Sequence, residues 1–348
     1  MSNINISKYI EFVSNKRNCR KLFFQYKDKY VSCNFNFDKE NIFSDAYLHQ
    51  YIKTSCPEKD IIANITIILD NYIYPESALY DSYDEQQFIL KTDPVYSEDK
   101  GNYFLEINDY IIHIWHYPWE SISITDKVKL EFTAIVNNEK DILDMFQFGV
   151  KRLLARYNRY NSIYTIHASG VSTDDSAFVF IAGGNSGKST LFLHLVAQGL
   201  VPINDDIVFW KVLDGSVYVH GCPTKVKLRK KWDKNILSFE NISTLFSKNE
   251  FYFTHNKTRL RAIFFPKFGY EKTKIYPIED TMVLKNILRA NISHMPISVD
   301  EQVLSDIRKL MALPLFKLEM SNNYEEICKE ILNFIGGKNN GMVKKRKT

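Results

Sequence analysis

The sequence predicts an α/β (α+β) protein in which a β-rich N-terminal domain precedes a mixed-sheet core. Short runs rich in Ile, Tyr and Phe fill the first part of the chain. Past the middle, a glycine-rich segment joins an apolar run to an amphipathic one, and further strand and helix patterns follow it. A run of strands followed by alternating strands and helices is typical of two domains with different architectures.

Composition bounds the class of protein. The chain has 348 residues, of which 45% are hydrophobic, so it is long enough to form two folded domains. Its start carries charged residues where a signal peptide has its apolar region, and no run approaches the roughly 20 apolar residues of a membrane helix. We therefore expect a cytoplasmic protein without a membrane partner. The five cysteines lack C-x-x-C spacing, which indicates reduced thiols.

The charge pattern bears on nucleic-acid binding. The net charge is +4, and a basic run at the end of the chain, Lys344-Lys345-Arg346-Lys347, accounts for it. The body of the chain is then close to neutral, whereas a dedicated nucleic-acid binder usually has a broad basic face. We expect no nucleic-acid partner, and we interpret residues 336–348 as a basic disordered tail.

Residues 1–140 are predicted to form the β-rich domain, which is a candidate for substrate or partner recognition. Its apolar runs, such as residues 61–67 and 110–114, are separated by Asp, Asn, Pro and Lys clusters. This pattern is typical of antiparallel strands. Residues 141–160 carry apolar side chains at helical spacing, which predicts a helix linking the two halves. We place a domain boundary just before this helix, so that residues 141–335 form the second domain.

The second domain is predicted to begin with a strand hairpin. Residues 162–168 and 177–181 are its strands, and the polar segment 172–176 is its turn. An amphipathic helix over residues 188–198 comes after a glycine-rich turn. Gly199 follows this helix, at a position where a helix C-terminus favours positive φ.

Later patterns complete the domain. Residues 200–203 predict a short strand, and the Asp214-Gly215 turn predicts a hairpin between residues 207–213 and 216–220. The remaining predicted elements are a strand at 260–266 and helices near 281–290, 298–311 and 324–334.

The glycine-rich turn has the sequence of a phosphate-binding P-loop (Walker A motif). The pattern GxxxxGK[ST] after a strand and before a helix lets backbone N–H groups hold phosphate oxygens. Here Ala182 replaces the first glycine. The predicted nucleotide-binding residues are Gly183, Gly184, Asn185, Ser186, Gly187, Lys188, Ser189 and Thr190. Lys188 is expected to reach the β- and γ-phosphates, Ser189 to bind Mg²⁺, and Thr190 to contact the α-phosphate. A turn that binds nothing is the alternative.

An aspartate pair, Asp205-Asp206, ends the strand directly after the predicted helix. A βαβ unit brings the C-terminal ends of both strands to one edge of the sheet, so the pair should face the loop. Neighbouring carboxylates repel each other, and Mg²⁺ bound to one leaves the other free to take a proton. The pair predicts one metal-binding and one catalytic aspartate, with a polar turn as the alternative.

His167 and five basic residues are further candidates. A single histidine in an apolar strand is more often a core residue than a catalyst. Two runs of alternating basic residues would each place their charges on one face of a strand, where they could stabilise a phosphoryl group or form a solvated face. These residues are Lys225, Lys227, Arg229, Arg259 and Arg261.

The combination of His167-Ala168, the loop, the helix ended by Gly199 and the aspartate pair resembles the HPr serine kinase/phosphorylase family. That family shares its nucleotide-binding core with the ATP-dependent phosphoenolpyruvate carboxykinases. The resemblance covers residues 163–208. Ala182 and the length of the loop mark a divergent member.

The resemblance implies a mixed-sheet P-loop fold with ATP and Mg²⁺ as cofactors. It further implies that Asp205 acts as base towards a substrate hydroxyl, that Asp206 supports the metal, and that His167 lies near the base. The expected activity is transfer of the γ-phosphoryl group to a hydroxyl of a peptide, protein or small molecule. The alternative is a nucleotide-gated binding module that transfers nothing. A carboxykinase-like lyase would need a second metal site, whose ligands we do not find. The acceptor and the formation of a homo-oligomer stay open.

Overall fold

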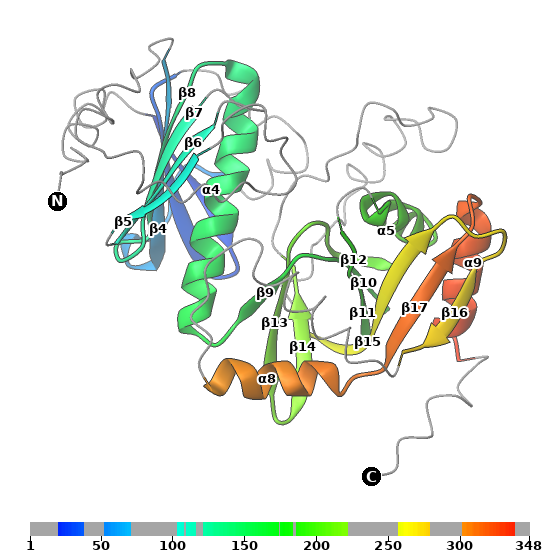
Figure 1. Cartoon of the computed structure of the whole chain (residues 1–348). Coiled ribbons are helices and arrows are strands. Elements are labelled where there is room, and N and C mark those ends of the chain that lie inside the picture. The colour runs from blue at the N-terminus through cyan, green and yellow to red at the C-terminus, as the bar shows by residue number, and fades with distance from the viewer. Residues whose placement is uncertain are drawn as a thin grey trace. The chain divides into compact units, whose positions relative to one another are not determined.

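The structure is a computed structural model that describes residues 20–37, 52–70, 103–107, 109–115, 121–173, 175–183, 186–221, 257–278 and 301–337. These residues form an α/β protein with two mixed sheets (Figure 1). The chain divides into two compact units between Tyr157 and Asn158. The basic run at the end of the sequence lies outside the described residues.

The first unit contains an eight-stranded mixed sheet. Its strands are β1 (Arg20–Tyr26), β2 (Lys29–Phe35), β3 (Ile52–Lys53), β4 (Ile61–Leu69), β5 (Tyr103–Ile107), β6 (Tyr110–Trp115), β7 (Ser121–Asp126) and β8 (Glu131–Val136), with the 3-10 turn η2 (Glu58–Asp60) before β4. They run in the order β3-β1-β2-β4-β8-β7-β6-β5. The pairs β2/β4 and β4/β8 are parallel, so the expectation of an antiparallel domain is wrong in the middle of the sheet.

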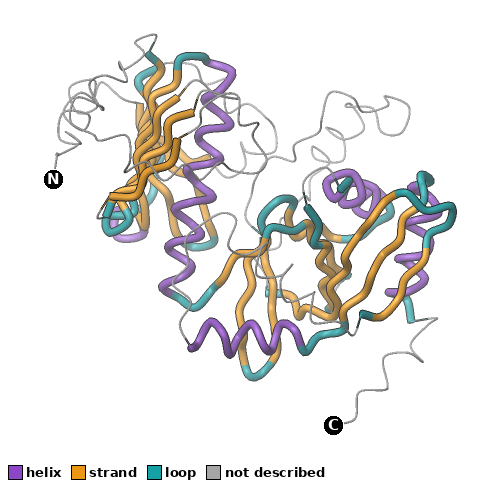
Figure 2. The backbone as a smooth tube through the Cα atoms, viewed as in Figure 1, coloured by secondary structure: helices purple, strands orange, loops and turns teal. Residues whose placement is uncertain are grey.

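Helix α4 (Glu139–Tyr160) packs on this first sheet, as Figure 2 shows. The ring of Phe146 meets that of Phe24 at a centroid distance of 5.7 Å. Gly149 lies so close to Phe132 that an added Cβ would come within 2.5 Å of its ring. The division between the units therefore falls near the end of this helix, whereas the sequence led us to expect it just before residue 141.

The second unit is built on a nine-stranded mixed sheet. Its strands are β9 (Tyr164–Ile166), β10 (Ser169–Ser172), β11 (Ser176–Phe180), β12 (Val201–Asn204), β13 (Val208–Leu213), β14 (Ser216–His220), β15 (Thr258–Phe268), β16 (Lys274–Pro277) and β17 (Leu315–Met320). Its helices are α5 (Lys188–Ala197), α8 (Glu301–Met311) and α9 (Tyr324–Ile335). Seven strands follow the order β12-β10-β11-β15-β14-β13-β9, and β17 pairs with both β15 and β16.

The two faces of the second sheet are covered by different helices. Side chains alternate along a strand, so neighbours such as Ile263 and Phe264 point to opposite faces. Ile263 belongs to the buried cluster that includes Val303 and Ile307 of α8. The ring of Phe264 instead lies against that of Phe334 of α9, with a centroid distance of 5.6 Å. Helices α5 and α9 lie beside each other on the sheet, away from α8 (Figure 1).

Several sequence predictions for this unit are confirmed. Helix α5 and strand β12 lie where the pattern placed them, and Gly199 has φ +95° at the end of the helix. The β13–β14 hairpin turns through Asp214 and Gly215, which both have positive φ. The predicted helix near 281–290 lies outside the described residues.

The first strand of the predicted hairpin is wrong, whereas the turn near residues 172–176 and the second strand are confirmed. Residues Tyr164–Ile166 pair with β13, and the chain bends at His167 before a separate strand, β10, begins. It is β10 that forms the hairpin with β11. The amide of Ala168 donates to the carbonyl of Asp206 at 3.2 Å, outside both ladders, which is consistent with the break between β9 and β10.

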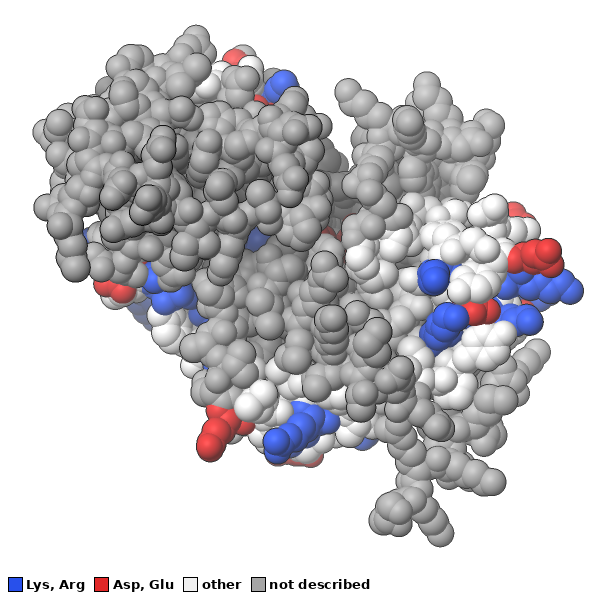
Figure 3. Space-filling view, viewed as in Figure 1, with Lys and Arg blue, Asp and Glu red and all other residues white. Residues whose placement is uncertain are grey.

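The described residues also show whether a helix could cross a membrane and how charges are distributed on one face. No described helix is both long and apolar enough to cross a membrane. On the face that Figure 3 draws, basic and acidic side chains of the described residues lie next to one another.

Candidate functional site

Strand β11, helix α5 and strand β12 place the predicted loop and the aspartate pair at one edge of the second sheet. Strand β10 lies between β11 and β12 and is antiparallel to both, so these two strands run in the same direction. The loop follows β11, and Asp205 follows β12. The C-terminal ends of both strands thus meet at this edge, which is where ligands bind in open α/β sheets.

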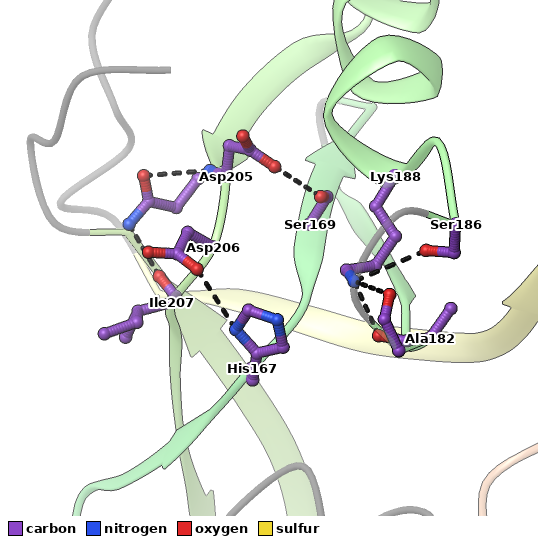
Figure 4. A network of polar contacts seen from close by, with 10 residues as sticks. His167, Ser169, Ala182, Ser186, Lys188, Asp205, Asp206 and Ile207 are labelled. Carbon is purple, nitrogen blue, oxygen red and sulfur yellow. Dashed lines mark hydrogen bonds and ion pairs between the residues drawn. The ribbon is translucent and has the colours of Figure 1, made fainter. Parts of the chain in front are cut away.

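Lys188 begins α5, and its ammonium group folds back onto the loop (Figure 4). Its Nζ donates to the carbonyl oxygens of Ala182 at 2.5 Å and Gly183 at 2.9 Å. Burial lowers the pKa of Lys188, although the charges of Asp205 and Asp206 act in the opposite direction. A buried cation at a helix N-terminus suits an anionic ligand, because both favour negative charge there.

Gly187 is the point at which the loop turns into the helix. It has φ +74°, which a residue with a side chain rarely adopts. An added Cβ would lie 2.2 Å from Cε2 of Phe268 and 3.2 Å from the hydroxyl of Tyr324. Glycine is therefore required here by the backbone and by packing. Gly184 and Asn185 lie outside the described residues.

Asp205 is held in a buried hydrogen-bonded turn. It is 4% exposed, and its Oδ1 accepts a hydrogen bond of 2.6 Å from Oγ of Ser169. Its amide donates to Oδ1 of Asn204 at 2.9 Å, and Nδ2 of Asn204 donates to the carbonyl of Ile207 at 2.6 Å. These contacts fix the carboxylate before any ligand binds.

Asp206 points the other way and pairs with His167. Its Oδ1 lies 3.1 Å from Nδ1 of His167, and 38% of its side chain is exposed. Asp206 has φ +78°, a left-handed conformation that costs a non-glycine residue about 1 to 3 kcal/mol. Such strain gathers at functional sites, where the surrounding structure enforces it.

The basic candidates are not brought to the loop. Arg259 and Arg261 are exposed on one face of β15, as their spacing predicts. Their end of β15 pairs with the first residues of β11, however, whereas Phe264 pairs with Phe180 beside the loop. At about 3.3 Å per residue, Arg259 lies roughly 16 Å along the strand from that edge. Lys225, Lys227 and Arg229 lie outside the described residues.

Three residues at this edge were missed by the sequence reasoning. Ser169 contacts Asp205, while Phe268 and Tyr324 pack against Gly187. Ser169 follows the His167-Ala168 pair closely, so the break between strands would have been its signal. Phe268 and Tyr324 carry no local signal, because distant segments bring them there.

The oxygen atoms at the site are donors of the kind that binds Mg²⁺. The structure brings Ser189 of α5 and the carboxylates of Asp205 and Asp206 to the same sheet edge. Within the described ranges, no three or more His, Cys, Asp or Glu residues gather as a metal site. Mg²⁺ is usually held by one or two carboxylates together with substrate phosphates. The donors therefore fit Mg²⁺ that arrives with a nucleotide.

Comparison with solved structures finds a distant structural similarity. No family model and no curated protein matches the chain. A solved structure of the HPr(Ser) kinase/phosphatase from Coxiella burnetii is similar over 51% of this chain and 98% of that chain. The identity is 17% and the TM-score is 0.29, so this is a distant structural similarity.

Proposed function

We propose that this protein is an ATP- and Mg²⁺-dependent kinase that transfers the γ-phosphoryl group to a hydroxyl of a peptide, protein or small molecule. One observation carries the proposal: the loop lysine and two carboxylates with different partners share one sheet edge. Lys188 is buried on the loop, Asp205 is fixed by Ser169, and Asp206 is paired with His167. A phosphate site beside a carboxylate that can take a proton is what phosphoryl transfer requires.

The contacts favour an assignment of the two aspartates opposite to the one that the family resemblance implies. Asp205 is buried and its charge acts on Lys188 more strongly than that of Asp206, so it suits Mg²⁺ bound beside the phosphates. Asp206 is partly exposed and bonded to His167, so it suits the role of base towards an acceptor that enters from solvent. Bound Mg²⁺ would neutralise charge on the phosphates.

The reaction then follows from these positions. Asp206 takes the proton of the acceptor hydroxyl, while the oxygen of that hydroxyl forms a bond to the γ-phosphorus. The bond from the γ-phosphorus to the bridging oxygen breaks, and ADP leaves with that electron pair. Lys188 and the N–H groups at the start of α5 hold the phosphate oxygens. His167 orients the Asp206 carboxylate.

Transfer can be tested without knowing the acceptor. The protein is mixed with γ-labelled ATP and lysate of its native host, and mass spectrometry identifies whatever gains a phosphate. We expect a labelled product that disappears with Lys188→Ala. Nucleotide binding without any labelled product above that control would contradict the kinase and support the gated binding module.

Comparing nucleotide binding with phosphoryl transfer distinguishes the roles of the two aspartates. Asp206→Asn should bind MgATP as the wild type does but transfer at least a hundredfold more slowly, as expected for loss of a general base. Asp205→Asn should lose most of the effect of Mg²⁺ on ATP affinity, measured by calorimetry with and without EDTA. The reverse result would restore Asp205 as the base.

A further inference from the structure

The N-terminal end of helix α9 lies against helix α5. The ring of Tyr324, the first residue of α9, stacks on His194 with a centroid distance of 4.5 Å and an interplanar angle of 9°. Phe268 meets the other side of this pair edge-on, at 5.7 Å from the Tyr324 ring. The three rings form a cluster that joins α9, α5 and the end of β15.

The hydroxyl of Tyr324 reaches the loop itself. It is hydrogen-bonded to the side chain of Thr190, the third residue of α5. It also lies 3.2 Å from the position that a Cβ on Gly187 would take. Burial raises the pKa of Tyr324, so its hydroxyl keeps its proton at neutral pH. One tyrosine thus contacts both the last glycine of the loop and the third helical residue after it.

Tyr324 is itself held in place by a separate hydrogen-bond network. Asn323 caps α9 by accepting from the amides of Glu325 at 3.0 Å and Glu326 at 3.2 Å. The carboxylate of Glu326 accepts from the amide of Thr273 at 2.7 Å and from Oγ of Ser321 at 2.9 Å. These bonds tie the start of α9 to the chain between β15 and β16. The tyrosine is therefore preorganised against the loop.

We propose that Tyr324 is a positioning residue of the nucleotide site, acting through Thr190. This inference rests on the proposed function and on the contact of Thr190 with the α-phosphate that the loop motif predicts. The hydrogen bond with the Tyr324 hydroxyl holds the side chain of Thr190 in one orientation in the first turn of α5, beside the loop. The stack on His194 holds the last turn of α5, while the Tyr324 hydroxyl holds Thr190 in the first turn, where the N–H groups receive the phosphates.

A double-mutant cycle tests the inference on the full chain. The affinity for MgADP is measured by calorimetry for wild type, Tyr324→Phe, Thr190→Val and the double variant. Tyr324→Phe keeps the ring stack and removes only the hydroxyl. Loss of one neutral hydrogen bond predicts about fivefold weaker binding. Because the tyrosine acts through the threonine, the double variant should bind no more weakly than Thr190→Val alone.

Controls separate this effect from general destabilisation. Tyr276→Phe removes an exposed hydroxyl from β16 and should leave affinity unchanged. Melting without nucleotide shows whether each variant folds. Wild-type affinity in Tyr324→Phe, or additive losses in the double variant, would overturn the inference alone. A wild type that binds no nucleotide would overturn both proposals. A coupled cycle without phosphoryl transfer would contradict only the kinase.

Discussion

The hydroxyl of Ser169 donates a hydrogen bond of 2.6 Å to the carboxylate of Asp205, and both residues are buried. Ser169 begins β10, and Asp205 directly follows β12, the strand paired with β10. The bond therefore sets the direction of a carboxylate at the edge where the loop also lies. It holds that direction in the absence of ligand.

Ser169→Ala tests this bond. Removing a donor from a buried carboxylate should lower the free energy of unfolding by about 1.5 to 3 kcal/mol and weaken MgATP binding. Denaturant unfolding and calorimetry measure the two effects. Ser172→Ala is the matched control, since Ser172 is buried on the same strand but its hydroxyl makes only a 3.5 Å contact with the carbonyl of Val201. Equal losses in both variants would contradict a specific role for Ser169.

Asp206 should show a trade between stability and activity. Asp206→Gly relieves the left-handed backbone, so we expect this variant to be at least as stable as the wild type although it loses the His167 contact. Asp206→Val keeps the strain with a β-branched side chain and should lose about 1 to 3 kcal/mol. Both should be inactive in transfer. If unfolding measurements found the glycine variant less stable than the valine variant, the strain would not be real.

Gly187→Ala should damage the loop through two effects. The positive φ costs about 1 to 2 kcal/mol, and the new methyl group would overlap the ring of Phe268. We expect a loss of about 2 to 4 kcal/mol in the free energy of unfolding and loss of nucleotide binding. Gly183→Ala is the control for folding, because a Cβ there would meet nothing within 4 Å. A fully stable Gly187→Ala would contradict the described packing.

His113 predicts a pH dependence for the first unit. Its Nε2 lies 3.3 Å from a guanidinium nitrogen of Arg152, and burial followed by that charge hold its pKa well below the ordinary 6.5. Below pH 6.5 the unfolded chain binds a proton that the folded unit does not bind. Stability should therefore fall as the pH falls from 6.5 towards the folded pKa, by at most about 1.4 kcal/mol per pH unit.

The variant His113→Gln checks this sign. Its unfolding free energy, measured in denaturant between pH 7 and pH 5, should fall less steeply than that of the wild type. If the two curves ran parallel, some other group would be responsible for the acid sensitivity of the unit.

Local patterns in the sequence predicted the elements around the loop. Helix α5 has a buried apolar face and ends at a glycine, and the β13–β14 hairpin has a Asp-Gly turn, so each is determined by neighbouring residues. The order of β11, α5 and β12 then predicted that Asp205 and the loop share an edge, which the strand pairing bears out.

Contacts between distant segments could not be predicted in this way. The parallel pairs of the first sheet and the pairing of β9 with β13 depend on which strands meet, and side-chain alternation is the same for each candidate partner. Tyr324 looks like an ordinary apolar residue at the start of an amphipathic helix. Only the docking of α9 on α5 shows that it contacts Thr190.

The docking of α9 has a consequence for biosynthesis. The loop is synthesised long before Tyr324. The nascent second unit therefore carries the glycine-rich turn before the helix that packs against α5 has been made. Until α9 emerges and its tyrosine stacks on His194, helix α5 lacks a partner that holds it in place. We therefore expect competence for nucleotide binding to appear late in translation, in a single step, when α9 docks.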